Sequence, residues 1–192
     1  MHSPHELQTP SPWVARWAAL VPAGAEVLDL ACGHGRHARL LAARGCRVLA
    51  VDRDAAALAS LADVAGVVTL RADLEGAPWP FPPARFAAVV VTNYLHRPLF
   101  EPLVGALAPG GVLVYETFML GNERFGKPSN PEFLLRPGEL LEVVRARLEV
   151  VAFEQGRVET PRPAMVQRIC AVRGAVGTAT IAPEAAGGAE IR

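Results

Sequence analysis

Two glycines, one cysteine and two histidines crowd into the stretch LDLACGHGRHARLL, which runs from Leu28 to Leu41. Cys32, His34 and His37 carry the donor atoms that zinc prefers, so their spacing first suggests a metal site. Zinc needs three or four converging ligands, however, and the remaining cysteines and histidines form no second cluster with ligand spacing. We therefore predict no metal site and interpret the stretch through its glycines.

Gly33 and Gly35 stand between a short apolar run and a helix-like run. Because glycine lacks a Cβ, it lets the backbone pass close to a ligand, and the N–H groups that open the following helix can face that ligand. This arrangement favours a nucleotide-like ligand. A Gly-x-Gly pattern alone is weak evidence, so a plain strand-to-helix turn stays open.

Carboxylates follow the next two strand-like runs. Asp52 stands where an acid can accept hydrogen bonds from both hydroxyls of a ribose, whereas Asp54 fits better as the N-cap of the next helix. Asp73 stands where a carboxylate can accept from an adenine amino group while a backbone N–H meets a ring nitrogen. Taken alone, Asp73 could equally be an exposed loop acid; together with Asp52 and the glycine loop it predicts a cofactor site.

The elements that must position these residues alternate between strand and helix. Strands are predicted at residues 26–30, 47–51, 66–70, 86–91, 112–118, 148–155 and 165–173, and helices at 13–20, 36–44, 54–63, 99–107 and 138–144, with a turn at 109–111. The last two strands lack room for a crossover helix between them. We predict an α/β fold: a Rossmann-like open sheet of about seven strands, mostly parallel with one antiparallel strand, and helices on both faces. Its site should follow the first four strands.

Composition indicates one soluble domain. The 192 residues are 51% hydrophobic, and no stretch reaches the roughly 20 apolar residues of a membrane helix. Nineteen basic and nineteen acidic residues cancel, which makes a nucleic-acid partner unlikely, and three cysteines with no secretory signal predict a cytoplasmic protein. We expect a mobile N-terminus at 1–12, a domain at 13–173 and a mobile tail at 174–192; the oligomeric state stays open.

The motifs resemble the class I S-adenosylmethionine-dependent methyltransferases. That family's glycine motif, an acid followed by a Gly-x-Gly, is present as DLACGHG, and VDRD, ADLEGAPWPF, FAAVVVTNYL and LAPGGVLVYETF follow in the family's order. Within the family, FLLRPGEL looks closest to the small bacterial methyltransferases of the tellurite-resistance type. The resemblance implies S-adenosyl-L-methionine as cofactor and S-adenosyl-L-homocysteine as product.

The resemblance also implies a role for each matching position. Asp52 would bind the ribose, Arg53 would lie against the adenine, and Asp73 with Leu74 would bind the adenine. The methionine part would be contacted by Asp29, Ala31, Cys32, Gly33, Gly35, His37, Thr92 and Asn93. Two departures are Ala31, where many members carry glycine, and Arg53, which is longer than the apolar residue often found there.

Two other functions stay open. The pattern from Gly33 to Ala38 also satisfies the dinucleotide fingerprint, and Asp52 would suit NAD, so an NAD-binding Rossmann oxidoreductase is the alternative. Asp29, Asp73 and the closing pair of strands favour methyl transfer over it. A catalytically inactive cofactor-binding regulator would keep the same residues, and only turnover distinguishes it.

Direct in-line transfer to a small-molecule acceptor requires a positioned nucleophile and the exclusion of water. Tyr94, His96 and Arg97 follow the methionine-contacting position and are our catalytic candidates, with His96 a possible base. His96 could equally be an ordinary residue in the first turn of a helix, and Arg97 an ordinary solvated charge. The identity of the acceptor also stays open. The polar loop at 119–136 is either a connector or a lid that offers Glu123, Arg124, Lys127 and Asn130.

Overall fold

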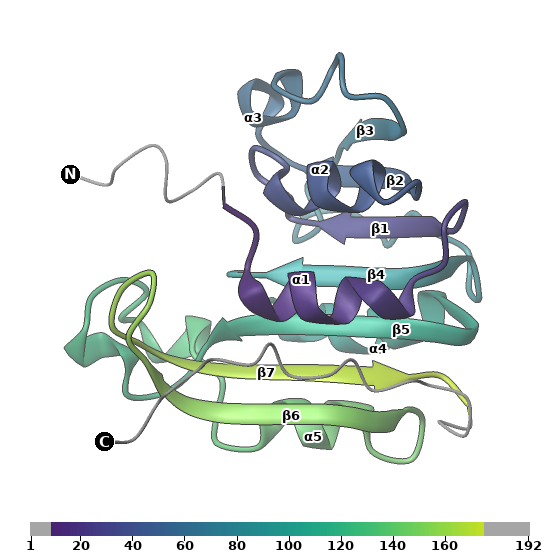
Figure 1. Cartoon of the computed structure of the whole chain (residues 1–192). Coiled ribbons are helices and arrows are strands. Elements are labelled where there is room, and N and C mark those ends of the chain that lie inside the picture. The colour runs from purple at the N-terminus through teal and green to yellow at the C-terminus, as the bar shows by residue number, and fades with distance from the viewer. Residues whose placement is uncertain (1–8, 175–192) are drawn as a thin grey trace, which may run out of the picture.

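One seven-stranded sheet runs through residues 9–174, the part of the chain that the computed structural model describes (Figure 1). Its order is β3-β2-β1-β4-β5-β7-β6, and only β7 runs against its neighbours. The strands are β1 (Glu26–Leu30), β2 (Arg47–Asp52), β3 (Val67–Arg71), β4 (Phe86–Thr92), β5 (Leu107–Phe118), β6 (Glu149–Val158) and β7 (Ala164–Val172). The predicted sheet, parallel except for one strand, is confirmed.

Helices cover both faces of this sheet, as predicted (Figure 1). One face carries α1 (Pro12–Trp17) with the 3-10 turn η1 (Ala18–Leu20), α2 (Arg36–Ala43) and α3 (Ala55–Ala59); the other carries η2 (Arg97–Leu99), α4 (Phe100–Ala106) and α5 (Glu139–Val144). Short 3-10 turns η3 (Asn122–Arg124) and η4 (Pro131–Phe133) lie in the long connection after β5.

The alternation of side chains along β1 divides the core in two. Leu28 and Leu30 enter the core beneath α4 and α5, whereas Val27 enters the core beneath α1 and α2, and all three are 0% exposed. A strand buried on both faces reads as a continuous apolar run, which is why β1 was predicted with its observed bounds.

Local caps set where the helices begin. The Ser11 hydroxyl accepts from the Trp13 N–H ahead of α1, and the Asp54 carboxylate accepts from Ala56 and Ala57 at the start of α3. Ser11 is 5% exposed, so the folded domain begins before residue 13, where its boundary was predicted. Most of the two predicted mobile ends, residues 1–8 and 175–192, lies outside the described residues.

Two elements differ from the sequence prediction. The helix expected at 54–63 stops at Ala59, where the Ser60 hydroxyl donates to the Ala57 carbonyl that a further turn would use. The turn expected at 109–111 is instead an irregular part of β5, since pairing with β4 jumps from Leu107 to Val112. A Cβ on Gly111 would lie 2.8 Å from the Ala108 carbonyl oxygen, so this bulge requires glycine.

The strand order reverses between β1 and β4, and a ligand cleft is expected at the C-terminal ends of strands beside such a reversal. None of the helices formed by residues 9–174 is long and apolar enough to cross a membrane.

Candidate functional site

A cleft of about 360 Å³ opens at the C-terminal ends of the parallel strands. Each strand from β1 to β5 contributes to its wall, and the connection after β5 closes one side. The lining residues are Ala31, Asp52, Arg53, Ala72, Asp73, Leu74, Glu75, Asn93, Tyr94, Leu95, Thr117, Phe118, Pro128 and Phe133. The sequence predicted lining residues after the first four strands. It missed Thr117 and Phe118, which lie at the end of β5.

The glycine loop connects β1 to α2 through a backbone with positive φ at Ala31 (+52°), Gly33 (+54°) and Gly35 (+74°). A Cβ on Gly33 would meet nothing within 4 Å, whereas one on Gly35 would overlap the Leu61 side chain. Gly35 therefore makes room for Leu61, and the role of both glycines in admitting a ligand stays a prediction.

Asp52 ties this loop to the end of β2. Its Oδ2 accepts from the Gly33 N–H at 2.7 Å, and its Oδ1 accepts from the Asp54 N–H at 2.9 Å. Each carboxylate oxygen has a second lone pair, so Asp52 can still accept from a ligand in the cleft that it lines. The Asp52 side chain thus shapes the loop and presents an acceptor at the same time.

The far wall of the cleft comes from the segment after β3 and from Tyr94. Asp73 is exposed and accepts from the Glu75 N–H at 3.1 Å, while Leu74 is buried and gives the wall an apolar surface. Burial, and then the Glu75 carboxylate, raise the pKa of Tyr94 well above its ordinary value. The Tyr94 hydroxyl therefore keeps its proton and can serve as a hydrogen-bond donor.

Asp29, in β1, and Cys32, in the loop itself, are buried and are not among the residues that line the cleft, where the prediction placed them. Asp29 is 1% exposed, and burial raises its pKa to about 7 against the lowering effects of the Ala38 N–H and Arg36. Its Oδ2 has no hydrogen-bond partner among the described residues. Burial also raises the pKa of the Cys32 thiol far above its ordinary value, so this thiol does not ionise at neutral pH.

His37 and Thr92 hold the start of the domain, and neither is among the residues that line the cleft, where the prediction placed them. The Nε2 of His37 accepts from the Ser11 N–H at 3.0 Å, so the proton resides on Nδ1, which lies 3.3 Å from the Thr92 hydroxyl. His37 is 1% exposed, and burial lowers its pKa to about 3, which keeps the imidazole neutral. Its partner Ser11 also donates to Glu116 at 2.9 Å.

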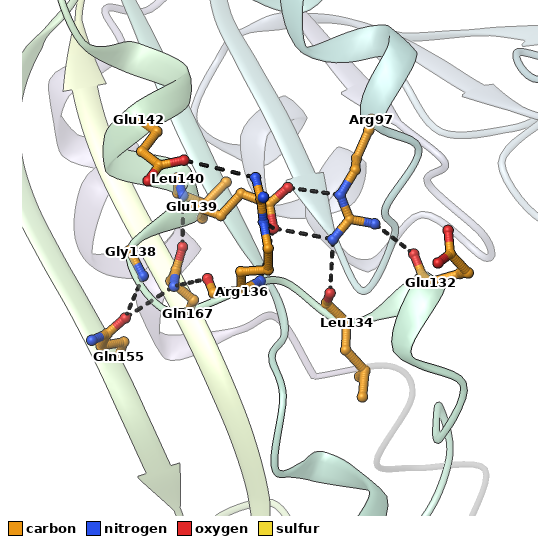
Figure 2. A network of polar contacts seen from close by, with 10 residues as sticks. All are labelled: Arg97, Glu132, Leu134, Arg136, Gly138, Glu139, Leu140, Glu142, Gln155 and Gln167. Atoms are coloured by element: carbon orange, nitrogen blue, oxygen red, sulfur yellow. Dashed lines mark hydrogen bonds and ion pairs between the residues drawn. The ribbon is translucent and has the colours of Figure 1, made fainter.

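Arg97 is the centre of a buried polar network, shown in Figure 2. Its guanidinium donates to both carboxylate oxygens of Glu139, at 2.7 and 3.0 Å, and to the carbonyls of Glu132 and Leu134. Glu139 also accepts from the Arg136 N–H at 2.7 Å. Because these bonds occupy the guanidinium, the prediction that Arg97 orients an acceptor is corrected: Arg97 fixes the segment at 132–136 to α5.

The network continues into β7. Gln167 is 0% exposed; its Oε1 accepts from the Leu140 N–H at 2.7 Å, and its amide donates to the Arg136 carbonyl and to Gln155 (Figure 2). Gln155 in turn accepts from the Gly138 N–H at 2.9 Å. The start of α5, which has no side-chain cap of its own, is therefore capped from the sheet.

Of the three catalytic candidates, only Tyr94 lines the cleft. His96 is half-buried and precedes η2 without capping it, and it is not among the lining residues. The sequence argument for His96 as a base is therefore not supported by its position.

The segment at 119–136, which the sequence left open as a connector or a lid, is held against β7 and supplies one side of the cleft. Asn122 is 1% exposed; its amide donates to the Pro128 carbonyl at 3.0 Å, and its Oδ1 accepts from the Met165 N–H at 3.1 Å. Glu123 and Arg124 bond back to Gly121 within the segment. These contacts hold the segment against β7.

A second cavity of about 530 Å³, which is shallow and opens widely to solvent, adjoins the cleft. The two share four lining residues, and the rest of the second wall comes from the segment after β5 and from the turn between β6 and β7. Its lining residues are Asn93, Phe118, Lys127, Pro128, Ser129, Asn130, Phe133 and Arg162. The sequence named Lys127 and Asn130 as lid residues but gave no signal for Arg162, which reaches the cavity only through the pairing of β6 with β7.

Residues 9–174 contain no group of three or more side chains that could hold a metal ion. Cys32, Cys46 and Cys170 are all buried free thiols.

The sequence of this chain is similar to the sequences of known methyltransferases. Residues 27–111 match the family model of a methyltransferase domain, and they carry the glycine loop, Asp52 and Asp73. A protein of Mycobacterium tuberculosis named as an uncharacterized methyltransferase is 38% identical over 117 residues, which cover 56% of this chain and 58% of the relative. The match thus spans less than two thirds of that relative's length.

Solved structures show the same fold. TehB from Haemophilus influenzae superposes with a TM-score of 0.73 at 18% identity, over 86% of this chain and 63% of TehB. An S-adenosylmethionine-dependent methyltransferase from Mesorhizobium loti superposes with a TM-score of 0.65 at 20% identity, over 83% of this chain and 98% of that protein.

Proposed function

Because residues 27–111 match the family model of a methyltransferase domain, we propose that this chain is an S-adenosylmethionine-dependent methyltransferase of the class I type, which binds S-adenosyl-L-methionine in the cleft and methylates a small-molecule acceptor. Methyl transfer is direct and in line, and S-adenosyl-L-homocysteine is the product. One observation carries the proposal: Asp52, the last residue of β2, and Asp73, two residues after the adjacent strand β3, line the same cleft beside the glycine loop.

The residues of the cleft fit an adenosyl cofactor. A volume of about 360 Å³ lies in the range of small-ligand sites, which combine apolar walls with a few placed polar groups. Ala72, Leu74 and Leu95 supply apolar wall for a flat base, and Asp52 supplies acceptors for a ribose diol. Asp73, exposed at the rim, would accept from the base's amino group.

The bound cofactor supplies an already activated methyl group, so the chain's residues need only position the acceptor and exclude water. None of the residues that line the cleft is a histidine or a cysteine. Pro128 and Phe133, from the connection after β5, also line the cleft and can help to exclude water from it. The transfer itself requires no base where the acceptor enters already nucleophilic.

Calorimetry with S-adenosyl-L-homocysteine tests the cofactor site. Asp52→Ala should weaken binding by roughly 1.5–3 kcal/mol, because hydrogen bonds to a charged group are lost. Asp54→Ala is the matched control: Asp54 caps α3 and does not line the cleft, so its loss should lower stability by about 1 kcal/mol and leave affinity unchanged.

Three results separate the competing functions. NADH binding in place of S-adenosyl-L-homocysteine would establish the oxidoreductase alternative. An unchanged affinity in Asp52→Ala would show that the wrong acid was chosen. Cofactor binding without S-adenosyl-L-homocysteine release over a panel of thiols, acids, amines and metalloid oxyanions would indicate a regulator.

A further inference from the structure

We propose that the second cavity holds the methyl acceptor, and that this acceptor is a small organic anion with a flat apolar body. The inference rests on the proposed function, because it takes the first cleft as the cofactor's site. Two features of the second cavity carry it: the sign of its charges and the aromatic rings in its wall.

The cleft and the second cavity differ in the charge of the side chains that line them. The first cleft is lined by three acids, Asp52, Asp73 and Glu75, against one base, Arg53. The eight described residues that line the second cavity include Lys127 and Arg162 and no acid. A cavity lined by one sign of charge concentrates ligands of the opposite sign, so an anion is drawn to the second cavity and repelled from the first.

The rings of Phe118 and Phe133 give the second cavity an apolar surface. Phe133 is 53% exposed and lines both spaces, so its ring is accessible to a ligand in either of them. The Arg162 guanidinium lies 5.8 Å from the centre of the Phe118 ring and donates to the Lys127 carbonyl. A cation beside a ring suits a ligand whose anionic group is attached to a flat apolar body.

The position of the second cavity suits direct transfer. Asn93, Phe118, Pro128 and Phe133 line both spaces, so ligands in them would be in contact, as an in-line reaction requires. The segment that supplies Lys127 and Phe133 is held at one end by Asn122 and at the other by Arg97. The cavity is therefore formed before an acceptor arrives.

The test titrates benzoate, its neutral analogue benzamide and inorganic phosphate into the full chain by calorimetry, with and without saturating S-adenosyl-L-homocysteine. We expect benzoate to bind at least about 10-fold more tightly than either of the other two. Lys127→Met and Arg162→Met should each weaken benzoate binding by roughly 10-fold or more, the usual effect of removing a charged hydrogen-bond donor. Phe133→Ala should weaken benzoate and leave phosphate unchanged.

Arg145→Met is the matched control, because Arg145 is exposed at the end of α5 and lines neither space; benzoate affinity should not change. Equal affinity for benzoate and benzamide, or for benzoate and phosphate, would overturn the inference, as would an effect of Arg145→Met equal to that of Lys127→Met. Failure of S-adenosyl-L-homocysteine to bind, with benzoate still preferred over benzamide, would reject the proposed function alone.

Discussion

Replacement of Arg97 by methionine should destabilise the connection between the segment at 132–136 and α5. The substitution removes two bonds to Glu139, whose side chain is 4% exposed, and one bond each to the carbonyls of Glu132 and Leu134. Breaking a fully buried ion pair costs about 3–5 kcal/mol. The Arg97 side chain is 33% exposed and Glu139 keeps the Arg136 N–H, so we expect a loss of about 2–3 kcal/mol.

Thermal and urea unfolding measure this loss. A change of 1 kcal/mol moves the midpoint by roughly 2–4 °C in a domain of this size, so Arg97→Met should melt about 5–10 °C lower. Burial alone would raise the pKa of Glu139, but the bonds from Arg97 and from the Arg136 N–H outweigh it and lower that pKa. The pair therefore stabilises the fold above the unfolded pKa of Glu139 and is lost as pH falls. The difference between wild type and Arg97→Met should shrink in acid accordingly.

A surface pair joined by a single short bond is the control. Arg147 donates to Glu101 at 2.6 Å, but the Glu101 side chain is 78% exposed, so Arg147→Met should cost less than about 1 kcal/mol. In a double-mutant cycle, Arg97→Met and Glu139→Gln should cost less together than the sum of the two alone. Equal losses from Arg97→Met and Arg147→Met, or simple additivity in the cycle, would refute the reasoning.

Four further substitutions probe the glycine loop and the residues that pack around it. Ala31→Gly should raise the unfolding free energy by about 0.5–1 kcal/mol in a urea titration, because a φ of +52° strains an L-residue; a loss would show that the methyl group packs usefully. Gly35→Ala should lower it by about 2–3 kcal/mol through overlap with Leu61, and Leu61→Ala should suppress part of that effect; full additivity would contradict the overlap. Asp29 has its pKa raised to about 7, so the folded state holds its proton over a range where the unfolded state has lost it, and stability falls as pH rises from about 4 to 7. Asp29→Asn should abolish that slope, and in a urea titration at pH 8 its free energy of unfolding should exceed that of wild type by about 2–4 kcal/mol. If wild type were the more stable protein at pH 8, the buried charge would have a compensating partner.

The residues of the proposed cofactor site could be predicted from local sequence. A short, mostly apolar run such as Val27–Leu30 is typical of a strand covered on both faces, and the residue that follows each parallel strand is carried to one edge of the sheet. Asp52 and Asp73 were placed in this way, and both line the cleft.

The residues that were misassigned are those whose partners lie far along the chain. His37 has the position of a first-turn ligand residue, but Ser11, 26 residues earlier, occupies its Nε2. Arg97 follows the cofactor-side strand, but its carboxylate partner Glu139 is 42 residues later. Neither contact has a periodic or spacing signal, so a single sequence could supply the residue types near the site but not which of them face the cleft.

The two halves of the proposed site, for the cofactor and for the acceptor, differ in how freely their residues can be exchanged. Sheet pairing fixes the residues at the strand ends, so the cofactor half can change little without altering the fold. The acceptor half is supplied by a segment held through Asn122, Arg97 and Gln167, none of which lines either space. Because the holding contacts and the lining residues are different side chains, Lys127 and Phe133 can be exchanged without loosening the segment. Selectivity for the acceptor should therefore change with these two positions while affinity for the cofactor stays constant.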